Sequence, residues 1–178
     1  EPVFGREHFF RMKKGAQALG FAFDEAAAGE IFGFLRSGNA VVDPLTPNFY
    51  PINEKTAIMR VLLGKEGRFE VSFREFDAPK SFKIAVSGEK VCSKEPLLRH
   101  KTTYRPHFEA AFEKIKNGEI YDEIFFNENG ELTEGARTNI VIEKGGEFFT
   151  PPVECGLLNG IFRQELLKSG KCKEKILK

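Results

Sequence analysis

The sequence has no tryptophan, only two methionines and three cysteines, and almost no excess of charge of either sign. A net charge of +1 at pH 7 provides no basic field for nucleic acid or for an acidic membrane surface, so neither is an expected partner. No apolar run is long enough for a signal peptide or a membrane-spanning helix.

The cysteines and histidines lack the spacings that metal and redox sites need. Cys92, Cys155 and Cys172 are odd in number and too widely separated for a metal or dithiol motif. The three histidines show no paired spacing either. We therefore expect no metal site and a reducing, cytoplasmic location.

What the chain does contain is enough apolar material for a real core. Of its 178 residues 41% are hydrophobic, and 19 are phenylalanine, which we interpret mainly as core packing. A polar stretch with a proline, residues 77–80, separates two strand-rich segments. We expect a small N-terminal domain over residues 1–77 and a larger C-terminal domain over residues 78–178. The chain begins with Glu1 and not with methionine, which suggests that terminal segments are missing.

Hydrophobic periodicity predicts a mixed α/β (α+β) fold. Asp24 is the expected N-cap of the second helix, and Ser37 and Gly38 are its expected end. Helices are predicted over residues 6–19, 24–38, 104–116 and 156–167, and strands over 57–63, 69–76, 82–86, 121–126, 140–143 and 147–150.

One lysine is a candidate for covalent chemistry. Lys101 lies in the run Arg-His-Lys-Thr-Thr-Tyr-Arg, where cationic neighbours and partial burial would favour the neutral amine that a Schiff base requires. The alternative is a solvated lysine in a charged run.

One glutamate further along the chain is the second candidate. Glu134 is followed by small residues and then by an apolar strand. A carboxylate beneath a pyridine nitrogen would keep that nitrogen protonated, and a protonated ring accepts electrons from a carbanion. The alternative is a turn glutamate that points into water.

A loop that leads into a helix is the third candidate. Two prolines follow Thr150, and the run Gly-Leu-Leu-Asn-Gly-Ile-Phe-Arg then opens an amphipathic helix after Gly156. The free N–H groups at the start of such a helix can hold a phosphate. An ordinary loop-to-helix junction would look the same.

The order of these three motifs resembles the fold type IV pyridoxal phosphate enzymes, the class IV aminotransferases. This family includes branched-chain and D-amino acid aminotransferases and aminodeoxychorismate lyase. The run His-Lys-Thr-Thr-Tyr-Arg is most similar to the lyase branch, including lyase domains associated with aminodeoxychorismate synthase. The resemblance implies a two-domain, D-amino acid aminotransferase-like fold with pyridoxal 5′-phosphate between the domains.

The resemblance also implies roles for individual residues. Lys101 would hold the cofactor and move the substrate's Cα proton, and Glu134 would contact the ring nitrogen. A short motif, His8 to Met12, resembles the family's His-x-x-Arg-Leu, with methionine at the last position, and implies a phosphate contact from its arginine. The implied cofactor-binding set is Arg11, Lys101, Glu134, Arg137, Asn139, Leu158, Gly160, Ile161 and Phe162.

The implied reaction is release of pyruvate and 4-aminobenzoate from 4-amino-4-deoxychorismate, for folate synthesis. The resemblance also implies a homodimer. A branched-chain or D-amino acid aminotransferase of the same fold is the first alternative, and a non-catalytic partner domain of aminodeoxychorismate synthase is the second. Phe162 stands where the family's aminotransferases usually have threonine, so a hydroxyl contact to phosphate would be missing while the backbone contact remains.

Overall fold

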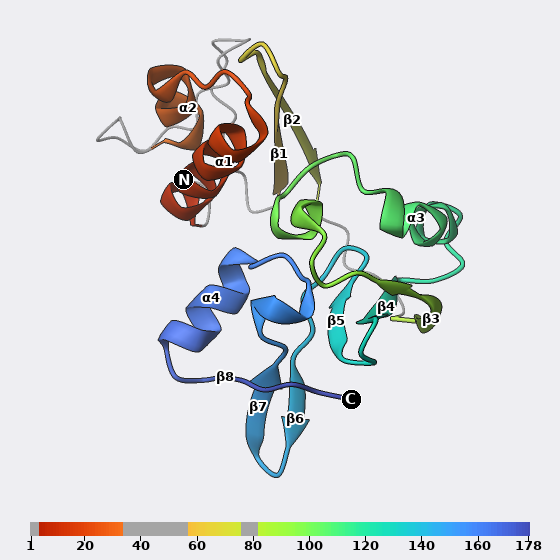
Figure 1. The fold of residues 1–178 in the computed structure, drawn as a ribbon. Coiled ribbons are helices and arrows are strands. Elements are labelled where there is room, and N and C mark those ends of the chain that lie inside the picture. Colours follow the sequence, from red (N-terminus) through yellow and green to blue (C-terminus); the bar gives the residue numbers. More distant parts are fainter. Residues whose placement is uncertain (1–3, 34–56, 76–81) are drawn as a thin grey trace. The chain divides into compact units, whose positions relative to one another are not determined.

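The computed structural model describes residues 4–33, 57–75 and 82–178 of the chain. The chain forms two compact units, Glu1–Ala78 and Pro79–Lys178 (Figure 1). The boundary expected between residues 77 and 78 lies outside the described residues and stays a prediction. Both units combine helices with strands, which confirms the predicted mixed fold class.

Helices α1 (Gly5–Leu19) and α2 (Glu25–Phe32) begin the first unit. Asp24 caps α2 as predicted, because its Oδ1 accepts the N–H groups of Ala26 at 2.9 Å and Ala27 at 3.0 Å. The predicted end of α2 is wrong. Gly33, at φ 77°, terminates the helix in the left-handed conformation, ahead of the glycine expected to end it.

Strands β1 (Ala57–Leu63) and β2 (Phe69–Glu75) lie in the two segments predicted as strands and pair as an antiparallel hairpin. Gly67 adopts φ 86° in the connecting turn, a conformation that favours glycine. Side chains of the hairpin pack on a helical core that consists of Phe9, Ala28, Ile31 and Phe32.

The described part of the second unit, residues 82–178, contains two three-stranded sheets and two α-helices. Their arrangement is drawn in Figure 1. One sheet has the order β3-β4-β5, with β3 and β4 parallel, and the other has the order β6-β7-β8. The strands are β3 (Ile84–Val91), β4 (Asp122–Asn127), β5 (Leu132–Gly135), β6 (Ile142–Lys144), β7 (Glu147–Thr150) and β8 (Lys173–Glu174), and the helices are α3 (Glu109–Lys116) and α4 (Ile161–Lys168). Short 3-10 helices cover Pro96–Arg99, Pro106–Phe108 and Val153–Cys155.

Several elements of this unit differ from their predictions. β3 extends to Val91, beyond the predicted 82–86, and β5 and β8 were not expected as strands. The helix predicted over 104–116 begins as a 3-10 helix at Pro106, because proline fits the first turn but has no N–H to continue a helix.

The core of the second unit lies between α3 and the β3-β4-β5 sheet. Phe108 and Phe125 meet edge to face with ring centroids 4.7 Å apart, and Val91, Leu98 and Ala111 are buried with them. This core supports β4 and β5, the two strands that carry the polar cluster of the site.

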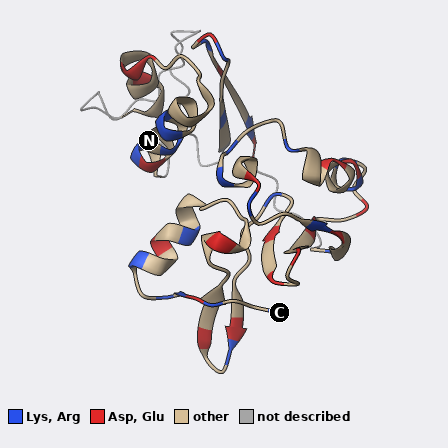
Figure 2. Ribbon diagram, in the orientation of Figure 1, with Lys and Arg blue, Asp and Glu red and all other residues tan. Residues whose placement is uncertain are grey.

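Charges of both signs are interspersed on the described elements of both units (Figure 2). None of the helices in the described parts of the chain has the length and apolar character needed to cross a membrane.

Candidate functional site

Glu134 lies in β5 and is almost completely buried, with 3% of its surface exposed. Its neighbour Thr133 donates its hydroxyl to the carbonyl oxygen of Phe125 at 2.9 Å, which ties β5 to β4. The alternative of a turn glutamate in water is therefore wrong. A β-strand presents this carboxylate to the interior of the unit.

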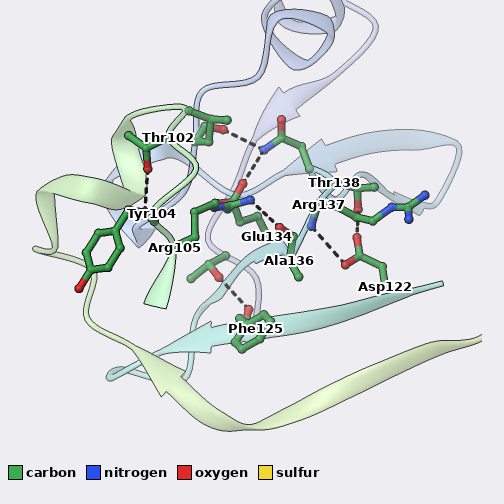
Figure 3. Close-up of polar contacts among 12 residues, drawn as sticks. Thr102, Tyr104, Arg105, Asp122, Phe125, Glu134, Ala136, Arg137 and Thr138 are labelled. Carbon is green, nitrogen blue, oxygen red and sulfur yellow. Dashed lines mark hydrogen bonds and ion pairs between the residues drawn. The ribbon is translucent and has the colours of Figure 1, made fainter. Parts of the chain in front are cut away.

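A guanidinium group meets the buried carboxylate (Figure 3). Arg105 Nη2 donates to Glu134 Oε1 at 3.2 Å, and Nη1 donates to the carbonyl oxygen of Ala136 at 2.6 Å. Its guanidinium carbon also lies 4.4 Å from the ring centroid of Phe108. Arg105 is thus held by ionic, polar and aromatic contacts.

Burial shifts the pKa values of both partners toward their uncharged forms. Burial raises the pKa of Glu134 to about 7, although the charges of Arg105 and Lys101 act in the opposite direction. Burial also lowers the pKa of Arg105, against the attraction of Glu134 and Asp122. Desolvation therefore exceeds the attraction within the pair. A further cationic donor would stabilise the ionised carboxylate.

Asn139 joins Glu134 to the loop before α4. Its Nδ2 donates to the carbonyl oxygen of Leu158 at 2.8 Å and lies 3.4 Å from Glu134 Oε2. A Cβ atom on Gly160 would lie only 1.9 Å from Asn139 Oδ1, so this approach requires glycine. We name Arg105, Glu134 and Asn139 the Glu134 cluster.

The start of α4 lies directly beyond this contact. Gly160 is the N-cap, and the first intrahelical bond runs from Gln164 N–H to its carbonyl oxygen at 3.0 Å. The N–H groups of Ile161 and Phe162 precede that bond and have no intrahelical acceptor. Ile161 is buried, whereas the Phe162 side chain is 65% exposed. We name residues 160–162 the α4 N-terminus.

Asp122, which the sequence analysis did not single out, shapes the turn after Glu134. Its carboxylate accepts the hydroxyl of Thr138 at 2.6 Å and the N–H of Arg137 at 3.3 Å (Figure 3). A Cβ atom on Gly135 would lie 2.3 Å from Asp122 Oδ2. Asp122 is the first residue of β4 and Gly135 is the last residue of β5. An aspartate at the start of one strand and a glycine at the end of the next is the sequence signal that could have identified Asp122.

The resemblance places both Arg137 and Asn139 in the cofactor-binding set, and their side chains have different partners in the structure. The guanidinium of Arg137 stacks on the ring of Tyr121 at 4.3 Å, away from Glu134 (Figure 3). Asn139 instead bonds within the Glu134 cluster.

Lys101 is exposed, so the partial burial predicted for it is wrong. It lies in the segment between the 3-10 helices at 96–99 and 106–108. The following residues turn back on themselves, because the Thr102 hydroxyl donates to the carbonyl oxygen of Tyr104 at 2.7 Å. Lys101 is close enough to Glu134 for its charge to lower the pKa of that carboxyl. The structure therefore brings the lysine, the glutamate and the α4 N-terminus into the same unit.

Arg11 belongs to the first unit. Its Nη2 donates to His8 Nδ1 at 3.2 Å, so the two polar residues of the predicted motif contact each other on α1. Burial lowers the pKa of Arg11. A predicted contact between this arginine and a phosphate stays a prediction.

Among the described residues, no three His, Cys, Asp or Glu side chains are grouped to hold a metal ion. The site is therefore built from one lysine, one buried carboxylate with its two partners, and one helix N-terminus.

A family model for amino-transferase class IV matches residues 1–178. Over 172 residues the chain is 26% identical to a Schizosaccharomyces pombe protein provisionally named aminodeoxychorismate lyase. This alignment covers 94% of this chain and 68% of that protein. The chain is also 36% identical over 56 residues to a Thermotoga maritima protein provisionally named branched-chain-amino-acid aminotransferase. That shorter alignment covers 32% of this chain and 20% of the relative.

The fold is also similar to that of solved structures. A crystal structure from Mesorhizobium loti, provisionally named an amino-acid aminotransferase, aligns with a TM-score of 0.77 and 27% identity. The alignment covers 97% of this chain and 78% of that chain.

Proposed function

Because the chain belongs to the class IV aminotransferase family, we propose that it is a pyridoxal phosphate enzyme that cleaves 4-amino-4-deoxychorismate. The products are pyruvate and 4-aminobenzoate, a precursor for folate synthesis. Pyridoxal phosphate is the cofactor of this family, and its protonated ring accepts the electrons of a carbanion.

The state of Glu134 is the observation that carries this proposal. A carboxylate with a pKa of about 7 is buried beside a single guanidinium, so its charge is only partly compensated. A protonated pyridine nitrogen would supply the missing cationic donor. An anionic group has a complementary place at the α4 N-terminus, which Asn139 links to the same carboxylate. The residues present therefore fit the cofactor.

The residues have the following roles in the proposal. Lys101 would hold the cofactor through its amine and would move the proton at the substrate's Cα. Glu134 would hold the proton on the ring nitrogen, and Leu158 would pack against the ring. The backbone N–H groups of Ile161 and Phe162 would bind the phosphate.

The remaining predicted contacts are weaker parts of the proposal. Arg11 would add a charged contact to the phosphate, on the strength of the resemblance of its motif. Arg137 would act near the phosphate only if its guanidinium left the ring of Tyr121, so we assign it no direct contact. Asn139 and Gly160 would hold the carboxylate and the helix start at the right separation.

Two observations favour the lyase reaction. The run from Lys101 to Arg105 resembles the lyase branch, and the relative that matches 94% of this chain has a lyase name. Both reactions share Cα deprotonation by the lysine, so the pocket's contacts with the substrate side chain decide between them.

An aminotransferase acting on branched-chain or D-amino acids is the second candidate. The local match to the Thermotoga maritima protein, at 36% identity, favours it. For either reaction the proposal includes a homodimer, and for the lyase it includes association with aminodeoxychorismate synthase. A non-catalytic domain that serves the synthase is the remaining alternative.

A substrate test separates these functions. Full-length protein with aminodeoxychorismate, and without any 2-oxo acid, is expected to release 4-aminobenzoate, which is detected by its fluorescence. Lys101→Ala is the matched control and should release none. Conversion of branched-chain or D-amino acids only in the presence of 2-oxoglutarate, with no 4-aminobenzoate, would contradict the lyase assignment and favour the second candidate. A protein that takes up no cofactor would favour the non-catalytic alternative.

A further inference from the structure

Arg105 is a buried guanidinium to which the proposed reaction assigns no role. Only 13% of its side chain is exposed. Its two terminal nitrogens are committed to different acceptors, the Glu134 carboxylate and the Ala136 carbonyl oxygen. Its guanidinium carbon lies 4.4 Å from the ring centroid of Phe108 and 5.7 Å from that of Phe112. These contacts leave the guanidinium little freedom to rotate.

A fixed guanidinium fixes the carboxylate that it binds. Arg105 bonds to Glu134 Oε1, and Ala136 is two residues further along the same strand end. The guanidinium therefore holds the Glu134 carboxylate in a fixed orientation relative to the backbone at Ala136. The amide of Asn139 lies 3.4 Å from Oε2, and the backbone of Leu158 also donates to this carboxylate. An ionised carboxylate offers about four lone-pair sites, so it can accept a further donor.

The charge of Arg105 also decides which form of Glu134 is present. Burial favours the neutral carboxyl, with a pKa of about 7, and Asp122 acts in the same direction. Arg105 contributes the largest opposing effect, ahead of Lys101. A neutral Glu134 would donate a proton to a ring nitrogen, whereas an ionised Glu134 would accept one from it. Arg105 lies against the carboxylate, so its charge stabilises the arrangement with the proton on the nitrogen.

We propose that Arg105 is a positioning residue that aims Oε2 of Glu134 at the cofactor's ring nitrogen and keeps their shared proton on that nitrogen. This inference rests on the proposed function, because it requires pyridoxal phosphate at Lys101. In this arrangement Arg105 acts through Glu134, whose Oε1 it binds.

The location of the proton can be measured without any turnover. Cofactor labelled with 15N at the ring nitrogen is bound to the full-length protein, and its chemical shift distinguishes a protonated from an unprotonated nitrogen. In the wild-type protein we expect the protonated shift at neutral pH. In Arg105→Met the stem still packs on the phenylalanines while the charge is lost. The equilibrium between the two proton positions should then move toward Glu134 by on the order of tenfold.

Two further variants distinguish positioning from a merely structural role. Arg105→Lys keeps the charge and should keep most of the proton on the nitrogen, although it cannot bond to both acceptors at once. Lys114→Gln is the matched control, since Lys114 also pairs with a buried carboxylate, that of Glu123, at 2.9 Å. It removes an ion pair outside the Glu134 cluster and should leave the shift at the wild-type value.

The outcomes separate this inference from the proposed function. A wild-type nitrogen shift in Arg105→Met overturns the inference while Lys101 and its cofactor remain in place. If that variant does not fold, Arg105→Gln takes the same measurement, because its amide can still donate to the Ala136 carbonyl oxygen. A failure of the wild-type protein to bind cofactor at Lys101 instead contradicts the proposed function itself.

Discussion

The Glu134 cluster and the α4 N-terminus are neighbours in the second unit, yet they are built in opposite ways. The cluster consists of side chains: a buried carboxylate, a guanidinium at 3.2 Å and an amide at 3.4 Å. The α4 N-terminus offers backbone N–H groups, and one of its side chains, Phe162, is largely exposed. Gly160 is where the two meet, against Asn139 Oδ1.

The difference determines how each region responds to substitution. The Glu134 cluster depends on charge in a desolvated place, so the loss of one partner leaves the other poorly compensated. The α4 N-terminus depends on helix geometry, so it tolerates any side chain that preserves the helix start. Substitutions should therefore have large effects in the first region and small effects in the second, except at the glycine that joins them.

The largest expected effect is a pH dependence of stability that arises in the Glu134 cluster. The pKa of Glu134 is about 7 in the folded protein and 4.5 at its ordinary value. The folded state thus binds the Glu134 proton more tightly than the unfolded state does, and this proton binding stabilises the fold. The stabilisation is complete below about pH 4.5 and is lost as the pH rises to about 7. We expect a loss of about 3 kcal/mol in the free energy of unfolding of the cofactor-free protein over that range.

Urea unfolding of the cofactor-free protein at a series of pH values measures this loss. Glu134→Gln should remove it, since glutamine does not titrate. Glu123→Gln removes a buried carboxylate outside the cluster, so this variant should still show the pH-dependent loss of stability. An identical pH profile in Glu134→Gln and the wild-type protein would contradict the assignment of the raised pKa to Glu134.

A smaller effect is expected where the two regions meet. Gly160→Ala is compatible with the backbone, at φ −63° and ψ 146°, but its Cβ would overlap Asn139 Oδ1. Displacement of Asn139 should cost about 1 to 3 kcal/mol and weaken cofactor binding by roughly tenfold.

Fluorescence titration with pyridoxal phosphate measures the affinity of this variant. Gly88→Ala is the control, because a Cβ atom there would meet no atom within 4 Å. Equal affinities of the two variants would show that the contact between Asn139 and Gly160 is not needed for the site.

The sequence predicted the backbone-built region better than the charged one. Gly160 and the helix after it are recognisable from glycine and an amphipathic pattern, and that helix is present as α4. The N-cap Asp24 and the first hairpin were recognisable for the same reason, because capping and turns are local. Local chemistry of this kind is readable from a few adjacent residues.

The Glu134 cluster depends on contacts between residues far apart in the chain, and it was predicted only in part. Glu134 was identified through a resemblance, whereas Arg105 and Asp122 were not assigned roles. Arg105 lies 29 residues from its carboxylate partner, a pairing that no local pattern specifies. β5 was missed for a similar reason, since a four-residue strand is defined by its pairing with β4.

The smallest expected effect is a side-chain change in the α4 N-terminus. Phe162→Ala removes a largely exposed ring and leaves the backbone N–H in place. Cofactor affinity should stay within about twofold of the wild-type value, as for most exposed positions. A loss of tenfold or more in the same titration would show that the ring itself contributes to the site, which would break the distinction between the two regions.

The central claim, that Lys101 carries the cofactor, can be tested on a single sample. Purified full-length protein loaded with pyridoxal phosphate is treated with borohydride, digested and mapped by mass spectrometry. The account predicts one stable pyridoxyl label, on the peptide that contains Lys101, and none in Lys101→Ala. A label on Lys94 or Lys114 instead, or an unlabelled protein, would contradict it.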